Sequence, residues 1–341
     1  MPTHEKSLRN LYNLWLIASL TLVLTMIIVG GLTRLTDSGL SITKWELFKG
    51  LLPPFTQTQW EIYFNDYKKI PQFEFINSSM TLNEFKVIFY WEYFHRFLGR
   101  LIGIFFLIPL LYFHFSKEIN NKKLIPCYII FALIVLQGAI GWYMVKSGLV
   151  NAVTVSHYRL SLHLTLAILI SSMIFWQILN IKNNVNKNFL NFSLKYTPYI
   201  FLIFLIFIQI ILGAFVSGLD AGKIYQTWPM MGNNYFPDDF FFKKITDFLN
   251  FDNHSLVQFY HRNVAYFIFF YIIILSFFIF KNNEKKLYKA AIFVNAILLI
   301  QVSVGILTLL SNLNILMASI HQVCGVILVL SAINLYYKSI N

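Results

Sequence analysis

Four histidines lie within long apolar stretches of the sequence, at His95, His163, His261 and His321. Polar side chains that can ligate a metal are rare in membrane helices and usually have a function there. A single histidine in such a place is more often a packing residue that forms a hydrogen bond. Four of them at matched positions of an internal repeat favour a shared role as ligands.

The elements that carry these histidines are predicted membrane helices. Of the 341 residues, 57% are apolar and 12% are charged, and the mean hydropathy is +0.61, whereas a soluble domain has about 25% charged residues. The apolar runs are close to the roughly 20 residues that cross a bilayer core. The sequence predicts an all-α polytopic membrane protein with eight transmembrane helices at 11–32, 86–113, 124–146, 157–180, 196–217, 256–280, 288–311 and 316–337.

The net charge of +12 follows from topology rather than from a nucleic-acid partner. Lysine and arginine are concentrated in the short connections on one side, where the acidic residues are Glu5, Glu118 and Glu284. The positive-inside rule therefore predicts that both termini are cytoplasmic. The first span lacks a cleavage motif and is expected to be a retained helix. Cys127 and Cys324 form no CxxC pattern, which argues against a disulfide framework, a zinc site and covalent haem attachment.

The second half of the chain repeats features of the first in the same order. The matched features are Gly30 with Gly213, Asp37 with Asp220, Trp45 with Trp228, His95-Arg96 with His261-Arg262, Gln137-x-x-x-Gly141 with Gln301-x-x-x-Gly305, and His163 with His321. Each half has four spans, so the repeat is parallel and predicts two four-helix bundles, at 1–190 and 191–341. The long outer loops, 33–85 and 218–255, are expected to be ordered lids. An ancestral duplication without chemistry would leave the same pattern.

The predicted topology pairs the histidines within each half. A rise of about 1.5 Å per residue places all four roughly 5–15 Å inside the outer ends of their helices. His95 should therefore face His163, and His261 should face His321. Zinc or copper would need three or four converging donors, whereas two imidazoles suit the axial positions of a haem iron.

The residues one helical turn after the histidines are all small. They are Gly99, Ala167, Ala265 and Gly325. Residues four apart share a helix face, so these positions leave room for a flat porphyrin. Small residues also serve close helix packing in membranes, which is the alternative explanation.

Arginine follows the histidine on two helices, at Arg96 and Arg262. Arginine is a natural partner for haem propionates, although snorkelling to the interface explains these positions equally well. The halves differ three residues before the histidine, where Glu92 corresponds to Gln258. Only the glutamate can ionise, so it can act as an acid, a base or a cation stabiliser. We therefore expect the first half to be catalytic and the second to hold a cofactor.

These motifs together resemble the haem A synthase family. The resemblance rests on Glu-x-x-His-Arg at 92–96, His-Arg at 261–262 and the segment Gly-Gly-x-Thr-Arg-x-x-Asp-Ser-Gly-Leu-Ser-x-x-x-Trp at 30–45. It implies oxidation of the C8 methyl of haem O to a formyl group by successive hydroxylations, giving haem A for terminal oxidases. It also implies that His261 and His321 hold a resident haem b, that His95 and His163 flank the substrate haem, and that Glu92 is the catalytic carboxylate.

The resemblance further implies a place and partners. The segment 33–85 contains no cysteine, which is similar to the cysteine-free branch of proteobacteria and mitochondria. The implied setting is a bacterial inner membrane, with the haem sites towards the periplasm and membrane lipid around the helices. Haem O would come from haem O synthase, the electron partner is not identified, and a homo-oligomer is compatible with the sequence. Two other functions stay open, a di-haem b-type electron carrier and a transporter built on the parallel repeat.

Overall fold

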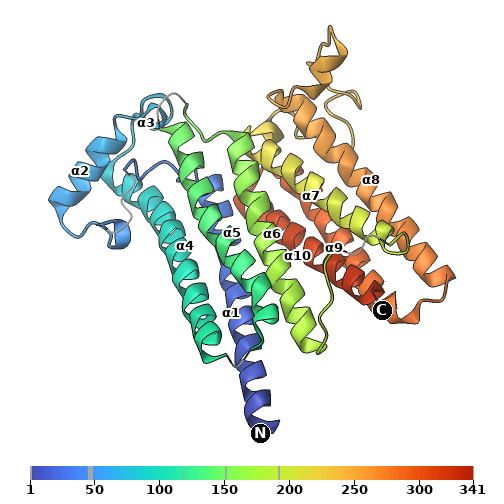
Figure 1. The fold of residues 1–341 in the computed structure, drawn as a ribbon. Helices are drawn as coiled ribbons and strands as arrows, with labels where there is room; N and C mark the ends of the chain where they lie inside the picture. The colour runs from blue at the N-terminus through green and yellow to red at the C-terminus, as the bar shows by residue number, and fades with distance from the viewer. Residues whose placement is uncertain (1, 45–48, 118, 150–151, 191–192, 341) are drawn as a thin grey trace. The chain divides into compact units, whose positions relative to one another are not determined.

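The computed structural model describes residues 2–44, 49–117, 119–149, 152–190 and 193–340. Within these residues, regular secondary structure is helical apart from one isolated β-bridge. Eight of the described helices are long and apolar enough to cross a membrane. The predicted class, an all-α protein with eight membrane-spanning helices, is confirmed (Figure 1).

The spanning helices follow the predicted order. They are α1 (Pro2–Leu35), α4 (Leu82–Ser116), α5 (Asn121–Gly148), α6 (His157–Lys182), α7 (Thr197–Gly218), α8 (His254–Lys281), α9 (Lys285–Leu310) and α10 (Ile315–Ser339). Several begin or end a turn or more beyond the apolar run, because polar residues at helix ends continue the backbone hydrogen bonding outside the hydrocarbon region.

The start of α4 shows why one predicted boundary was wrong. Thr81 and Glu84 form a capping box, in which the Thr81 amide donates to the Glu84 carboxylate at 2.7 Å. The helix therefore begins four residues before the apolar run at 86–113. His95 consequently lies about 20 Å from the first residue of α4, deeper along its helix than the expected 5–15 Å.

The chain divides into two compact units, residues 1–174 and 175–341. The first contains α1 to α5 and most of α6, and the second contains the end of α6 and α7 to α10. The end of α6 belongs to the second unit because Trp176 stacks near Phe189 and Tyr336, with ring centroids 4.9 and 5.6 Å apart. The different roles expected for 1–190 and 191–341 stay predictions.

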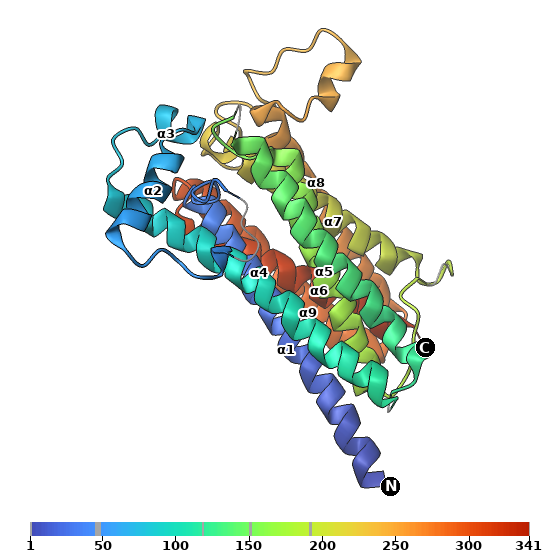
Figure 2. The same ribbon diagram turned by 60° about the vertical axis from the view of Figure 1, so that its left-hand side comes forward.

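In the first unit, α1 lies along α4, and α4 also packs on α5 (Figure 2). Aromatic rings fill the α1–α4 contact: Trp15 lies 4.8 Å from Phe106, and Tyr12 meets Phe113 edge-on at 5.3 Å between centroids. Each of these rings removes a large apolar area from its surroundings, so the contact holds the N-terminal half of α1 against the C-terminal half of α4.

In the second unit, α10 packs closely on α9 and also contacts α7, while α8 packs on α7 and α9. A side-chain hydrogen bond adds to the packing at two of these helix contacts. The Asn295 amide donates to the Ser276 hydroxyl at 2.7 Å between α9 and α8, and the Tyr271 hydroxyl donates to the Pro198 carbonyl at 3.0 Å between α8 and α7.

The first outer loop is ordered where it is described, as expected. It contains η1 (Lys49–Leu51), α2 (Gln57–Tyr67) and α3 (Pro71–Phe75). Buried side chains of α2, namely Trp60, Phe64 and Tyr67, pack on Phe85 and Phe89 of α4. The loop is therefore held against the first three turns of α4, at residues that precede His95 along the helix.

The second outer loop contains η2 (Ala221–Lys223), η3 (Ile245–Leu249) and the bridge between Met231 and Asn234. Asp239 fastens it to the start of α8: one carboxylate oxygen accepts from Ser255 at 2.6 Å and the other from Tyr225 at 2.7 Å.

We predict that replacing Phe85 by alanine releases α2 from α4. Phe85 is fully buried and lies 5.1 Å from Phe64 and 5.2 Å from Tyr67 between ring centroids. Losing a buried phenylalanine costs about 3–5 kcal/mol, so trypsin should cleave after Lys68 much faster in the variant. Phe75→Ala, at a side chain that is 72% exposed, is the control. Equal cleavage rates in both variants would show that this cluster does not hold the loop.

Candidate functional site

The structure brings together both predicted histidine pairs. His95 on α4 and His163 on α6 have ring centroids 6.4 Å apart, with an angle of 56° between the ring planes. His261 on α8 and His321 on α10 are also 6.4 Å apart, at 76°. All four rings are half-buried.

The separation fits a shared iron between each pair. With metal–nitrogen bonds of about 2.0 Å, two imidazoles that shared one iron would have their ring centres roughly 6 Å apart. Within the described residues, no three histidine, cysteine or acidic side chains converge as a metal site would require. Each pair therefore suits a metal whose remaining ligands arrive with it, as in a porphyrin.

In the first unit, each histidine ring rests against a glycine of the neighbouring helix. A Cβ atom at Gly30 of α1 would lie 3.0 Å from Nε2 of His95, and one at Gly141 of α5 would lie 3.0 Å from Cε1 of His163. Carbon and nitrogen atoms that are not bonded rarely approach so closely. The imidazoles thus occupy the space that any larger residue would fill.

The second unit repeats this arrangement. A Cβ atom at Gly213 of α7 would lie 3.1 Å from Cε1 of His261, and one at Gly305 of α9 would lie 2.7 Å from Cε1 of His321. The sequence showed these glycines as markers of the repeat but did not show that they contact the histidines. The signal was present, because each glycine sits on the helix that precedes a histidine-bearing helix.

Glutamines also approach the histidines, and the sequence reading did not assign them a role. Gln137 donates from its amide to the main-chain carbonyl of His163 at 2.9 Å, and Gln209 does the same to His261 at 2.9 Å. The Gln301 amide lies 3.4 Å from Nε2 of His321. Groups that contact a ligand in this way fix its orientation.

Glu92 is buried, and four donors surround its carboxylate. One oxygen accepts from the Ser41 hydroxyl and the Ile42 amide, both at 2.7 Å. The other accepts from Arg96, at 3.0 Å from Nε and 2.6 Å from Nη2. Glu92 and Arg96 form a buried ion pair, and their hydrogen bonds are charge-assisted. The helix that carries His95 therefore holds a buried carboxylate whose position is fixed by four donors.

The equivalent place in the second unit has an amide instead of the carboxylate. Gln258 donates to the Tyr225 carbonyl at 2.8 Å, and Arg262 donates to the same oxygen at 3.0 Å. Tyr225 corresponds in the repeat to Ile42, whose carbonyl likewise accepts from Arg96, at 2.9 Å. The backbone framework is thus shared, and the carboxylate is the difference between the two units.

The remaining predicted residues have contacts that the sequence did not indicate. Arg96 and Arg262 donate to groups of the outer loops, and a guanidinium has five N–H donors in all, so propionate binding stays a prediction. A Cβ atom at Gly99 would lie 3.3 Å from the Met26 methyl, and one at Gly325 would lie 3.4 Å from the Gln301 amide. Ala167 and Ala265 are half-buried. The room for a porphyrin at these four positions also stays a prediction.

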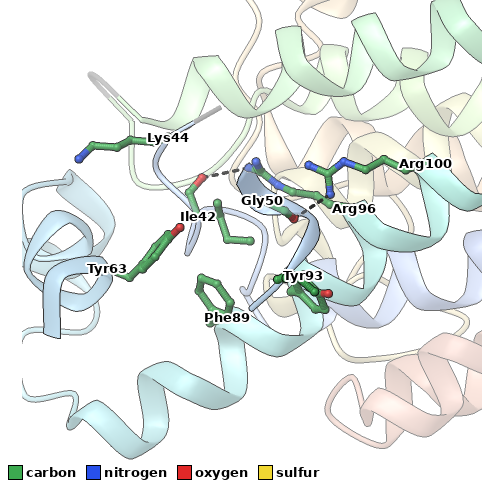
Figure 3. A pocket seen from close by; sticks show the side chains of 9 residues that line it. Ile42, Lys44, Gly50, Tyr63, Phe89, Tyr93, Arg96 and Arg100 are labelled. Atoms are coloured by element: carbon green, nitrogen blue, oxygen red, sulfur yellow. Dashed lines mark hydrogen bonds between the residues drawn. The ribbon is translucent and has the colours of Figure 1, made fainter. Parts of the chain in front are cut away.

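A pocket opens on the face of α4 that carries Arg96. It is lined by Ile42, Lys44, Gly50, Leu52, Tyr63, Phe89, Tyr93, Arg96 and Arg100. Figure 3 shows Arg96 donating to the Ile42 carbonyl and Arg100 donating to the Gly50 carbonyl, the latter at 3.2 Å. At its rim, hydrogen bonds from Lys44 and Lys69 lower the pKa of Asp66 below its ordinary value. The pocket adjoins the Glu92 network and includes two of its members, Ile42 and Arg96.

Comparison with known proteins decides the family. The model of the COX15-CtaA family, described as cytochrome oxidase assembly protein, matches residues 13–333. The chain belongs to this family. A heme A synthase of Pelagibacter ubique is 48% identical over 336 residues, covering 96% of each chain. One of Rickettsia felis is 41% identical, covering 96% of this chain and 98% of its own, and one of Rickettsia bellii is 42% identical, covering 92% and 94%. The resemblance to haem A synthases seen in the sequence is confirmed.

We predict that Gly141→Ala weakens haem binding in the first unit. The new methyl group would press on the His163 ring, and such overpacking costs about 1–3 kcal/mol, which corresponds to about 5-fold to 150-fold in affinity. Haem titration of the purified full chain measures the effect. Gly138→Ala, on the same helix with no atom within 4 Å of the added carbon, is the matched control. A Gly141→Ala protein that binds haem as tightly as this control would contradict the role of the close approach.

Proposed function

We propose that this chain is a haem A synthase, an oxidoreductase that converts the C8 methyl group of haem O to a formyl group. Each hydroxylation removes two electrons from the methyl carbon and adds one oxygen atom, and the resulting geminal diol loses water to give haem A. The observation that carries the proposal is the difference between the units: both have a histidine pair 6.4 Å apart, and one has a buried carboxylate where the other has an amide.

The proposal assigns a different haem to each unit. His95 and His163 would flank the substrate haem O, because Glu92 lies three residues before His95 on α4. His261 and His321 would hold a resident haem b, which when bound supplies one-electron transfer. Gln258 places no carboxylate beside this second pair, which suits a group that is held and not chemically changed.

Glu92 would act mainly through its charge. Its oxygens already accept from Ser41, Ile42 and Arg96, so a positioned carboxylate would lie beside the substrate as electrons leave the methyl carbon. In a site of low dielectric, a preorganised charge stabilises an opposite charge that develops in the transition state. The single hydrogen of the Ser41 hydroxyl can point to Glu92 at 2.7 Å or to the Ile88 carbonyl at 3.3 Å.

The proposed setting is a bacterial inner membrane with both termini cytoplasmic and the histidine pairs towards the periplasm. The distribution of lysine and arginine supports this orientation. Haem O synthase would supply the substrate. The electron partner and a homo-oligomeric state stay open.

The two other functions have weaker support. The relatives named above are heme A synthases, and a symmetric di-haem electron carrier gives no reason for Glu92 to differ from Gln258. A transporter of the parallel-repeat kind would have interrupted helices at mid-membrane. The eight long helices of the described residues are continuous between their ends.

We predict that Glu92→Gln stops haem A formation while haem binding continues. The variant keeps the shape of the side chain but loses its charge, and the loss of such a group typically lowers the rate by about 10²–10⁴-fold. The measurement is extraction of pigments from purified protein of cells that make haem O, with separation by chromatography and identification by mass. Glu84→Gln, at an exposed position of the same helix, is the control and should convert haem O normally.

Two results would count against this account. If Glu92→Gln makes haem A at the native rate, the carboxylate has no part in the reaction. If the unmodified protein contains haem b but never haem O, a hydroxylated intermediate or haem A, the proposed function itself fails.

A further inference from the structure

Each histidine-bearing helix packs on a partner helix that carries the same short motif, with one exception. The motif is a glutamine followed four residues later by the glycine that touches the histidine. It occurs at Gln137–Gly141 on α5, Gln209–Gly213 on α7 and Gln301–Gly305 on α9. On α1, the residue four positions before Gly30 is Met26.

Two of the glutamines tie the partner helix to the histidine residue itself. The amide of Gln137 donates to the His163 carbonyl, and that of Gln209 to the His261 carbonyl, both at 2.9 Å. The Gln209 amide also lies 3.4 Å from Nε2 of the His261 ring. These bonds cross between helices at the level of the ligand, so they restrict movement of the ring and of the backbone that carries it.

At His321 the restraint comes from the main chain of Gln301, because the side-chain amide lies on the nitrogen that an iron would take. The Gln301 amide lies 3.4 Å from Nε2 of His321, and the main-chain carbonyl of Gln301 is 3.1 Å from Nδ1 of the same ring. A carbonyl oxygen can only accept, so Nδ1 carries the proton and Nε2 keeps its lone pair. This is the tautomer that an axial haem ligand needs.

Met26 occupies the corresponding place beside His95. Its methyl group lies 3.3 Å from the Cβ position at Gly99, as the Gln301 amide lies 3.4 Å from the Cβ position at Gly325. A thioether has no hydrogen to donate. In the described part of the chain, no hydrogen bond joins α1 to His95, so on this side packing alone restrains the ligand.

A substrate haem must enter and leave, whereas a resident haem must stay. We propose that the amides of Gln137 and Gln209 and the main-chain carbonyl of Gln301 fix His163, His261 and His321 as permanent haem ligands, and that Met26 leaves His95 as the ligand that opens, so that the substrate haem is exchanged on the α1–α4 side of its site. Met26 is thus a positioning residue that acts through His95. This inference rests on the proposed function, because it needs one haem to be a substrate.

The test exchanges methionine and glutamine at Met26 and Gln209, which are matched positions of the two units. Met26→Gln should give His95 the bond that His163 and His261 have, and Gln209→Met, at the position that matches Met26, should remove it from His261. Purified full chain is loaded with haem b at both sites, and excess apomyoglobin captures the haem that dissociates. One hydrogen bond changes an equilibrium by about threefold to tenfold, so Met26→Gln should slow the fast phase of haem loss by that factor and Gln209→Met should speed the slow phase.

A second readout follows the ligand directly. Carbon monoxide binds reduced haem iron only when an axial histidine has detached, so its binding rate reports how often a histidine opens. Met26→Gln should lower this rate in the first unit by the same factor. Met26→Leu removes the sulfur without adding a donor and should behave like the unmodified protein in both assays.

The proposal is overturned if Met26→Gln leaves both rates unchanged, if Met26→Leu slows them as much, or if Gln209→Met does not speed haem loss from the second unit. Neither assay involves turnover. Their failure would therefore leave the conversion of haem O untouched, and a failure of that conversion would leave the exchange rates standing.

Discussion

The close approach of each imidazole to a glycine backbone is the constraint on which the rest of the structure depends. At four places, a histidine ring lies where the side chain of the neighbouring helix would be, with Cβ distances of 2.7–3.1 Å. Helices in membranes associate through such close packing, because lipid gives little hydrophobic drive. The helix contact and the ligand position are therefore set together, and the same 6.4 Å separation results in both units.

On this shared framework, one buried charge separates the units. A carboxylate within a membrane protein needs full compensation, and the first outer loop supplies it through Ser41 and Ile42 while α4 supplies Arg96. The packing of α2 on Phe85 and Phe89 fastens that loop to the same helix. The contacts that hold the first loop on α4 thus include its hydrogen bonds to Glu92. Gln258, by contrast, bonds only to a carbonyl of the second loop.

Much of this arrangement could be predicted from the sequence, because spans, repeats and histidine depth depend on local composition and helix geometry. The start of α4 could also have been predicted, since Thr81 and Glu84 have the spacing of a capping box. The prediction followed the apolar run instead and began four residues later. The bond from Arg96 to Ile42 could not be predicted, because Ile42 is distant in sequence and its carbonyl has no sequence signature. The ion pair of Arg96 with Glu92 has the spacing of neighbours on one helix face and could have been predicted. The role proposed for Met26 could be seen only in the structure. Its contact with Gly99 shows that it takes the place that a glutamine has on the other three helices.

The central claim is that each pair of imidazoles binds one haem iron. Electron paramagnetic resonance of the oxidised full chain, loaded with haem, tests it most directly. Two axial imidazoles force ferric haem into the low-spin state. We predict low-spin signals of the bis-imidazole type from both units, and replacement of the second-unit signal by a high-spin one in His321→Ala. A high-spin signal from the second unit of the unmodified protein, or no change in His321→Ala, would contradict the account.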